Sequence, residues 1–299
     1  GTDYWSMRKY LKQFLMDRRV VDIFKPLWWL ILNGPILTFR PSKSGKAYEK
    51  IWDKDNYGSP LRKHTVNQTK KLQELFKQDK QIIIEHAMRY GKPEIDKTLY
   101  KMKENGCTKI VLMPLYPQYA ASTSATVKDE VFKWLLEQRW QPDIRTISPW
   151  FDDRNYIKAL ANTIKDNLKN KTKPDMLLIS FHGIPKRYFM AGDPYHCHCI
   201  KTARLLRQEL KWPEDKILVT FQSRFGPEPW LQPYTDKTII DLAKKGLKNI
   251  AVVAPGFISD CLETLEELNV EARELFVENG GQNFEYIPCL NDNKHSIKL

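Results

Sequence analysis

One histidine follows a buried strand, a position from which an imidazole could bind a metal ion or accept a proton. Residues 177–181 are apolar or small, and Gly183 and Pro185 stop regular structure directly after His182. Ligands bind at the carboxyl edge of open α/β sheets, because the loops there vary while the strands fix their position. A plainer interpretation stays open from this residue alone: the histidine fills a polar slot at the strand end.

A second chemical candidate is a run of carboxylates near the end of the chain. Asp260 and Glu263 have the spacing of a capping box before a helix. Glutamates then recur at helical spacing on the face opposite the leucines, at Glu263, Glu267, Glu271 and Glu274. The pattern predicts either a solvated acidic face or a ladder of carboxylates leading to a metal or proton site.

The elements that position these residues are strands separated by helix-sized segments. Strands are predicted near residues 81–85, 109–113, 144–147, 176–180, 216–220, 249–253 and 284–287. This alternation is typical of parallel sheets with right-handed crossovers. An amphipathic helix is predicted at residues 5–17. The fold class is therefore α/β.

Two pairs of loops repeat along the chain. AMRYGKP echoes QSRFGPEP with Arg89 and Arg224 135 positions apart, and the next pair has Pro114 and Pro255 141 apart. These nearly equal offsets predict two similar Rossmann-like lobes, 1–146 and 147–299, each a parallel sheet of about four strands flanked by helices. Because the first lobe shows three strands and the second four, we expect a missing first strand ahead of residue 1.

Composition narrows the class of protein. The 299 residues are 42% hydrophobic and 28% charged, and the longest apolar run, 27–32, holds six residues, far fewer than the ~20 that span a bilayer. Five thinly spread cysteines and no recognisable leader predict a cytoplasmic, reducing location. The net charge of 48 minus 36, or +12, allows nucleic acid, an anionic membrane or an acidic small ligand as partner.

The region 20–52 has paired tryptophans, prolines and no clean period. It predicts an irregular apolar flap followed by a basic turn. Trp28 and Trp29 either pack in a core or form an exposed lip that meets a membrane or an apolar ligand. We expect residues 23–36 to form such a lip.

Several motifs, taken in order, resemble ferrochelatase, the enzyme that inserts ferrous iron into a porphyrin. They are AYEKIW followed by GSPLR, AMRYG, LYPQYAAST, FHGIP with GDPY, QSRFGPEPWLQP and APGFISDCLETLEE. Each motif is weak alone, but their joint order is specific and covers essentially the whole chain. The resemblance implies a chelatase fold whose two lobes hold the porphyrin between them, and formation of protohaem from protoporphyrin IX, the last step of haem biosynthesis.

The resemblance also implies roles for the residues described first. Metallation needs acceptors for the two protons that leave the pyrrole nitrogens. His182 is expected as base or metal ligand, Glu263 as its acidic partner, and Glu267 as proton exit or metal relay. Ferrous iron accepts both imidazole and carboxylate ligands. For these acids to point inward, we expect an irregular helix start such as a π-bulge.

The porphyrin propionates need cations and hydroxyls, and its flat ring needs apolar walls. An arginine can bind a carboxylate through two donors, which a lysine cannot. The resemblance implies porphyrin-binding roles for Arg40, Tyr48, Ser59, Arg89, Tyr119, Ser122, Trp230 and Phe257. Arg89 and Trp230 have an alternative role in packing between the two halves.

The HCHC run at 196–199 looks like a metal site, but four adjacent ligands rarely close one tetrahedral centre. Relatives that carry a [2Fe–2S] cluster have a cysteine at the position of Ala121 and more cysteines near a longer carboxyl end. This chain has Ala121 there and only Cys289 near its end. We therefore expect Fe(II) as the substrate metal and no iron–sulfur cluster.

Other functions stay open. The chain could metallate coproporphyrin or a cobalt-type tetrapyrrole, carry porphyrin or haem without catalysis, or bind nucleic acid through its charge. A carrier needs pocket arginines and aromatics but not His182 together with Glu263, so their co-occurrence favours an enzyme. The expected partners are protoporphyrin IX and ferrous iron, with peripheral contact at the inner membrane face through residues 23–36 and no nucleic acid.

Overall fold

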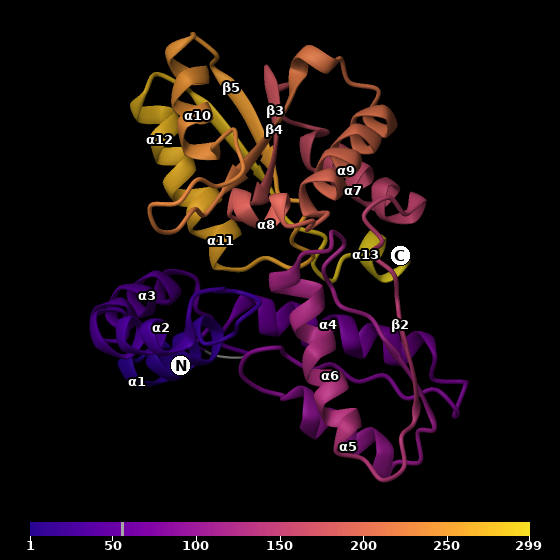
Figure 1. Ribbon diagram of the computed structural model, residues 1–299. Coiled ribbons are helices and arrows are strands. Elements are labelled where there is room, and N and C mark those ends of the chain that lie inside the picture. The colour runs from indigo at the N-terminus through magenta and orange to yellow at the C-terminus, as the bar shows by residue number, and fades with distance from the viewer. Residues whose placement is uncertain (55–56) are drawn as a thin grey trace. The chain divides into compact units, whose positions relative to one another are not determined.

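The computed structural model describes residues 1–54 and 57–299, which divide into two compact units (Figure 1). The first unit comprises Gly1–Leu115 and Ala120–Ser148, and the second comprises Tyr116–Tyr119 and Pro149–Leu299. The four-residue segment Tyr116–Tyr119 therefore groups with the second unit, although the chain on both sides of it belongs to the first.

The first unit combines helices with a parallel pair of strands, in which Lys109 lies opposite Asp143. A core of Leu99, Ile110, Val131 and Trp134 joins the sheet to two of the helices. In chain order the elements are α1 (Tyr4–Leu15), α2 (Lys25–Ile31), the π-helical turn η1 (Leu32–Ile36), α3 (Leu37–Ile51), α4 (Pro60–Leu75), α5 (Ile95–Glu104), β1 (Lys109–Leu112), the π-helical turn η2 (Ala121–Ala125), α6 (Thr126–Leu136) and β2 (Asp143–Thr146).

The strand predicted at residues 81–85 is wrong, so the sheet of this unit has two paired strands in the described residues rather than about four. Ile82 and Ile83 are 43% and 37% exposed, and the Gln73 side-chain amide donates to the Ile84 carbonyl over 2.8 Å. The apolar pattern resembled a strand, but a strand also needs a backbone neighbour to complete its hydrogen bonds. The local sequence does not show whether such a backbone neighbour is present.

The amino-terminal region is helical almost throughout. The predicted helix at residues 5–17 is confirmed as α1, with Met7, Leu11 and Leu15 buried. The irregular flap predicted for 20–52 is wrong, because α2, η1 and α3 occupy most of it. Gly34 departs from helical geometry, with φ −79° and ψ −107°, just before Pro35. This kink interrupts the apolar period that would otherwise have indicated a helix.

The paired tryptophans have different environments. Trp28 packs with Leu11 and Leu15, and its indole N–H donates to the Leu15 carbonyl over 2.7 Å. Trp29 is 50% exposed and belongs to a set of exposed apolar residues that also includes Ile23, Phe24, Leu27, Leu30 and Ile31. Core packing is therefore confirmed for Trp28, whereas Trp29 lies at the surface.

The second unit is a four-stranded parallel sheet with strand order β4–β3–β5–β6. Its elements are α7 (Arg154–Leu168), β3 (Met176–His182), α8 (Lys186–Met190), α9 (Tyr195–Leu210), the 3₁₀ turn η3 (Glu214–Lys216), β4 (Ile217–Gln222), α10 (Thr235–Lys244), β5 (Asn249–Val253), α11 (Leu262–Leu265), the π-helical turn η4 (Glu267–Ala272), α12 (Arg273–Glu278), β6 (Asn283–Ile287) and α13 (Lys294–Ile297).

Helices cover both faces of this sheet. In Figure 1, α10 and α12 lie on one side of the strands, and α7 and α9 lie on the other. The central strand β3 is buried from Leu177 to Phe181, as a parallel strand covered on both faces must be. The α/β class is therefore confirmed. Within the described residues, no helix has the length and apolar character that crossing a bilayer requires.

Candidate functional site

His182 is the last residue of β3 and lies at the carboxyl edge of the sheet, opposite Gln222 of β4. Its Nδ1 atom is 2.6 Å from the Gly183 carbonyl oxygen. Because a carbonyl oxygen can only accept, Nδ1 must carry the proton of this hydrogen bond. In the neutral ring the lone pair is then on Nε2, the arrangement that a base or a metal ligand needs.

Two aromatic rings flank this imidazole. The ring centroids of Trp230 and Phe257 lie 6.5 and 6.4 Å from that of His182. Trp230 is held by antiparallel pairing with Pro185, next to a bond of 3.0 Å from the Leu231 N–H to the Ile184 carbonyl. A Cβ atom on Gly183 would lie 3.2 Å from the Trp230 ring, so the glycine permits this close approach. The strand end thus brings two aromatic side chains close to the His182 ring.

Gln222 joins the strand end to the acidic segment. Its carbonyl accepts the Gly183 N–H over 2.8 Å, and its side-chain oxygen accepts the Ser180 hydroxyl over 2.8 Å. The side-chain nitrogen donates to the Glu263 carbonyl over 2.7 Å. Gln222 is buried, and these bonds fix the direction of its amide. The backbone of Glu263 is therefore tied to the same sheet edge as His182.

Ser223 makes the corresponding link to Glu267. Its φ of +63° is in the left-handed region, which costs a residue other than glycine about 1–3 kcal/mol. In this conformation its hydroxyl donates a short hydrogen bond to the Glu267 carboxylate. A strained residue directly beyond β4 thus orients the second carboxylate of the acidic run.

The acidic segment is not one regular helix. It consists of α11, the π-helical turn η4 and α12, which confirms the predicted π-type irregularity. Glu263 and Glu267 are half-buried, Glu271 and Glu274 are exposed, and Glu266 is buried with 5% exposure. A single solvated acidic face is therefore wrong, because the first two predicted acids lie in a different environment from the last two.

The capping box predicted for Asp260 and Glu263 is also wrong. Helix α11 begins at Leu262, and the Thr264 hydroxyl accepts the Cys261 N–H over 2.9 Å. The carboxylate of Asp260 instead accepts hydrogen bonds from Thr264, Tyr286 and Asn291 over 3.0, 2.5 and 2.6 Å. Asp260 is an anchor between the start of α11 and the end of β6.

The protonation of Glu267 is set by its surroundings. Burial raises the pKa of Glu267 to about 7, the Glu263 charge adds to this rise, and the hydrogen bonds from Ser223 and Gln222 oppose it. A carboxyl with this pKa exchanges protons near neutral pH, which suits transfer of protons rather than a permanent charge.

Four of the predicted porphyrin-binding residues belong to the first unit. Arg40 and Tyr48 are on α3, Ser59 directly precedes α4, and Ser122 is in η2. All four are half-buried. The Tyr48 ring makes edge contacts with Tyr10 and Trp52 at centroid distances of 6.5 and 6.3 Å. Their role in ligand binding stays a prediction.

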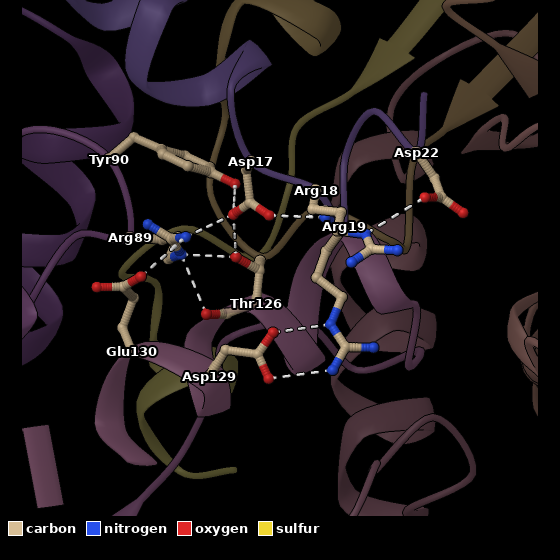
Figure 2. Close-up of polar contacts among 9 residues, drawn as sticks. All are labelled: Asp17, Arg18, Arg19, Asp22, Arg89, Tyr90, Thr126, Asp129 and Glu130. Carbon is tan, nitrogen blue, oxygen red and sulfur yellow. Dashed lines mark hydrogen bonds and ion pairs between the residues drawn. The ribbon is translucent and has the colours of Figure 1, made fainter. Parts of the chain in front are cut away.

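Arg89, the fifth predicted residue of this unit, is part of a polar network shown in Figure 2. Its Nη2 forms a short ion pair with Asp17 and lies 3.4 Å from a Glu130 oxygen, and its Nε donates to Thr126 Oγ1 over 2.7 Å. The Arg89 and Asp17 side chains are 13% and 6% exposed. These contacts all lie within the first unit and give Arg89 a structural role there, whereas its packing between the two halves stays a prediction.

The same network joins three parts of the unit. Tyr90 donates to Asp17 over 2.9 Å, and burial together with the Asp17 charge raises the pKa of Tyr90, so its hydroxyl stays protonated. Arg19 binds both carboxylate oxygens of Asp129 over 2.7 and 3.1 Å. The chain after α1, the loop at Arg89 and the first turn of α6 are thereby held together (Figure 2).

The residues of the HCHC run point in different directions on α9. Cys197 is exposed and Cys199 is buried, and burial raises the pKa of the Cys199 thiol. The His196 ring contacts Phe221, at a centroid distance of 5.8 Å. Within residues 1–54 and 57–299, no three His, Cys, Asp or Glu side chains gather as a group that could hold a metal ion.

Sequence reasoning missed Gln222, Ser223 and Asp17. The first two follow β4 at the carboxyl edge, within the QSRFG motif, so the rule that located His182 could have found them. Asp17 carried no such signal, because its partners lie 72 and 109 positions along the chain.

Comparisons with known proteins identify the family. A family model described as Ferrochelatase matches residues 2–299. Ferrochelatase of Allorhizobium ampelinum is 54% identical over 300 residues, covering 100% of this chain and 87% of that protein. Ferrochelatase of Rhizobium meliloti is 55% identical over 300 residues, covering 100% and 88%.

Solved structures resemble this chain in fold. SirB from Bacillus subtilis with Fe³⁺ matches with a TM-score of 0.56 at 16% identity, covering 81% of this chain and 88% of that one. The sirohydrochlorin chelatase SirB from the subspecies spizizenii, in complex with cobalt, matches with a TM-score of 0.54 at 16% identity and the same coverage. At this identity the likeness concerns the fold alone.

The Asp17 network generates a stability prediction. We expect Asp17→Asn to lower the free energy of unfolding by about 1–3 kcal/mol, because it removes the nearer carboxylate from the largely buried Arg89 charge and leaves only the more distant Glu130. Asp22→Asn is the matched control, since the Arg18 and Asp22 side chains are 75% and 56% exposed, and surface pairs are worth about 0–1 kcal/mol. Urea unfolding of both variants measures the difference, and equal midpoints would contradict the buried role.

Proposed function

Because the chain belongs to the ferrochelatase family, it inserts ferrous iron into a porphyrin in haem biosynthesis, and we propose that His182 and Glu263 carry the reaction on protoporphyrin IX. One observation supports this assignment above the others. The His182 ring, protonated on Nδ1, lies near the Trp230 and Phe257 rings, at centroid distances of 6.5 and 6.4 Å, and Gln222 ties the backbone of Glu263 to the same strand end.

Iron insertion releases two protons from pyrrole nitrogens, and the proposed site has acceptors for them. His182 Nε2 takes a proton, and the hydrogen bond from Nδ1 to the Gly183 carbonyl stabilises the imidazolium that forms. Glu263 accepts the other proton or binds the incoming iron together with His182. Glu267, with its pKa of about 7, passes protons to or from Glu263.

The porphyrin contacts are proposed from the resemblance and from local surroundings. Trp230 and Phe257 provide apolar walls beside His182. Arg40, Tyr48, Ser59, Tyr119 and Ser122 provide a cation and hydroxyls for the propionates. Arg89 was predicted in the same role, but its bonds to Asp17 and Thr126 favour a structural one.

Two alternatives remain beside this proposal. Coproporphyrin has four carboxylates and protoporphyrin two, and the motif set is closer to that of protoporphyrin enzymes. A porphyrin carrier would need the aromatic walls but no pair of proton acceptors.

We also expect no iron–sulfur cluster, and analysis of the purified protein for acid-labile sulfide would test that.

We further propose that the protein is cytoplasmic and contacts the inner membrane face peripherally through residues 23–36. Phe24, Leu27, Trp29 and Leu30 are each at least half exposed, at 74%, 53%, 50% and 62%. Contiguous exposed apolar groups of this kind typically mark an interaction site. Lys25, beside them, and the net charge of +12 favour an anionic surface.

The catalytic assignment predicts a loss of rate without loss of binding. His182→Ala should lower kcat by ~10²–10⁴ while porphyrin affinity changes little, and Glu263→Gln should behave alike. The double variant should be little worse than the poorer single one, because the two residues act as a unit. Anaerobic assays with Fe(II) and protoporphyrin measure these rates, and a near wild-type rate for His182→Ala would overturn the catalytic assignment.

A higher kcat/KM on coproporphyrin than on protoporphyrin in the same assay would reverse the substrate proposal.

The pKa of Glu267 predicts a pH dependence. Only the ionised carboxylate accepts protons, so kcat should rise with pH through about 7. Glu267→Gln should remove this limb of the pH profile, whereas Glu274→Gln, at an exposed position of α12, should keep it. An unchanged limb in Glu267→Gln would assign the titration to another group.

The membrane proposal predicts binding to vesicles that contain anionic lipid at low salt. Trp29→Ala together with Leu30→Ala should reduce binding severalfold, because both side chains are exposed. Val277→Ala, an equally exposed apolar residue on α12, is the control. Sedimentation with vesicles measures the bound fraction, and equal binding of all variants would exclude this contact.

A further inference from the structure

The metal-like run on α9 contains one residue, His198, that contacts the segment Tyr116–Tyr119. Its imidazole stacks on Phe151, with ring centroids 3.7 Å apart and planes 10° from parallel. Its Nδ1 atom is 3.2 Å from the backbone nitrogen of Tyr119. Because a backbone N–H can only donate, Nδ1 must accept, and in the neutral ring the proton is on Nε2.

Thr202, one turn further along α9, holds the residue before Tyr119. Its hydroxyl accepts from the Gln118 side-chain nitrogen over 3.0 Å and donates to the Phe151 carbonyl over 2.7 Å. Residues four apart lie on one face of a helix, so His198 and Thr202 face the segment together. Gln118 is 2% exposed, which makes its amide costly to leave without these bonds.

Besides Thr202, the Tyr156 hydroxyl accepts from the Gln118 side chain over 3.4 Å, so several contacts within the second unit hold this segment. It is four residues long, and the chain on both sides belongs to the first unit. A backbone–backbone hydrogen bond, from the Trp150 N–H to the Pro117 carbonyl over 3.1 Å, also attaches its middle to the second unit. Helix α9 and residues 150–151 therefore determine where the backbone of Tyr119 lies in the unit that carries His182.

We propose that His198 is a positioning residue for porphyrin binding, which fixes the backbone of Tyr119 through Nδ1 while the Phe151 ring holds the imidazole plane. This inference rests on the proposed role of Tyr119 as a porphyrin-binding residue. It gives the HCHC run a function in which no metal takes part.

The surroundings of His198 favour the neutral ring that this role needs. Burial lowers the pKa of His198, nearby Lys201 acts in the same direction, and Asp152 and Asp193 oppose the change. At neutral pH the ring can therefore accept from Tyr119. In acid, a protonated Nδ1 would face the Tyr119 N–H as a second donor, and the hydrogen bond would be lost.

Two substitutions separate the hydrogen bond from the stacking. His198→Phe keeps an aromatic ring against Phe151 but removes the acceptor, whereas His198→Asn retains an acceptor near the Nδ1 position and loses the ring. We expect His198→Phe to raise KM for protoporphyrin about fivefold, the equivalent of one hydrogen bond, with kcat nearly unchanged. His198→Asn should recover most of the wild-type KM. His295→Phe, on α13, removes a bond to Asp166 on α7; it is the control and should leave KM unchanged.

A second measurement does not depend on activity. Hydrogen exchange of the Tyr119 amide, followed by NMR or mass spectrometry, should be faster by on the order of tenfold in His198→Phe and near normal in His198→Asn. If His198→Phe does not fold, the wild-type protein at falling pH supplies the same test. Tyr119 exchange, corrected for intrinsic rates, should accelerate as the ring becomes protonated, and His198→Asn should lack that acceleration.

The outcomes are distinct from those of the catalytic proposal. Unchanged Tyr119 exchange in His198→Phe would overturn the hydrogen-bond role of His198. Faster exchange with an unchanged KM would overturn its role in porphyrin binding. A near wild-type rate for His182→Ala would reject the catalytic assignment but would leave the exchange result for His198 intact.

Discussion

The parallel register between β3 and β4 is the constraint on which the site of the second unit depends. It sets His182 opposite Gln222 at the last rung of the ladder. From that rung Gln222 reaches the backbone of Glu263, and Ser223 reaches the carboxylate of Glu267. A shift of one residue would turn these side chains to the other face of the sheet. The register between β3 and β4 therefore determines which side chains meet at the carboxyl edge of the sheet.

Asp260 and Glu267 differ in how many hydrogen-bond donors surround their carboxylates. Asp260 is buried, but donors from Thr264, Tyr286 and Asn291 surround its carboxylate, which suits an anchor. Glu267 is half-buried beside Glu263 with fewer donors, and its pKa rises to about 7. Glu267 opens the π-helical turn η4 and is half-buried, whereas Glu271 and Glu274 are exposed. The pKa of Glu267 is therefore raised because its hydrogen-bond donors only partly offset burial and the Glu263 charge.

In the first unit, some residues are buried and hydrogen-bonded, whereas others of the same type lie at the surface. Arg89 is held by Asp17 and Thr126, and Trp28 by the Leu15 carbonyl and a leucine core. Trp29, the next residue, lies at the surface. Buried polar groups need partners far more than exposed ones do. The buried members of this unit are therefore committed to structure, and the exposed apolar residues of α2 are available for contact with another surface.

The sequence by itself determined the α/β class, the position of His182 at a strand end and the helix at residues 5–17. These follow from periodicity and from glycine and proline positions, which are local signals. The irregularity of the acidic segment was expected only from the family resemblance, because the implied roles of its acids require them to point inward. Only the tertiary structure decided that residues 81–85 form no strand, that Asp260 is an anchor rather than a cap, that Trp28 and Trp29 differ, and that Arg89 and His198 have partners distant in the chain. Each of these depends on hydrogen bonds or burial between residues far apart in the sequence, and the local pattern of residues does not record which distant group will be near.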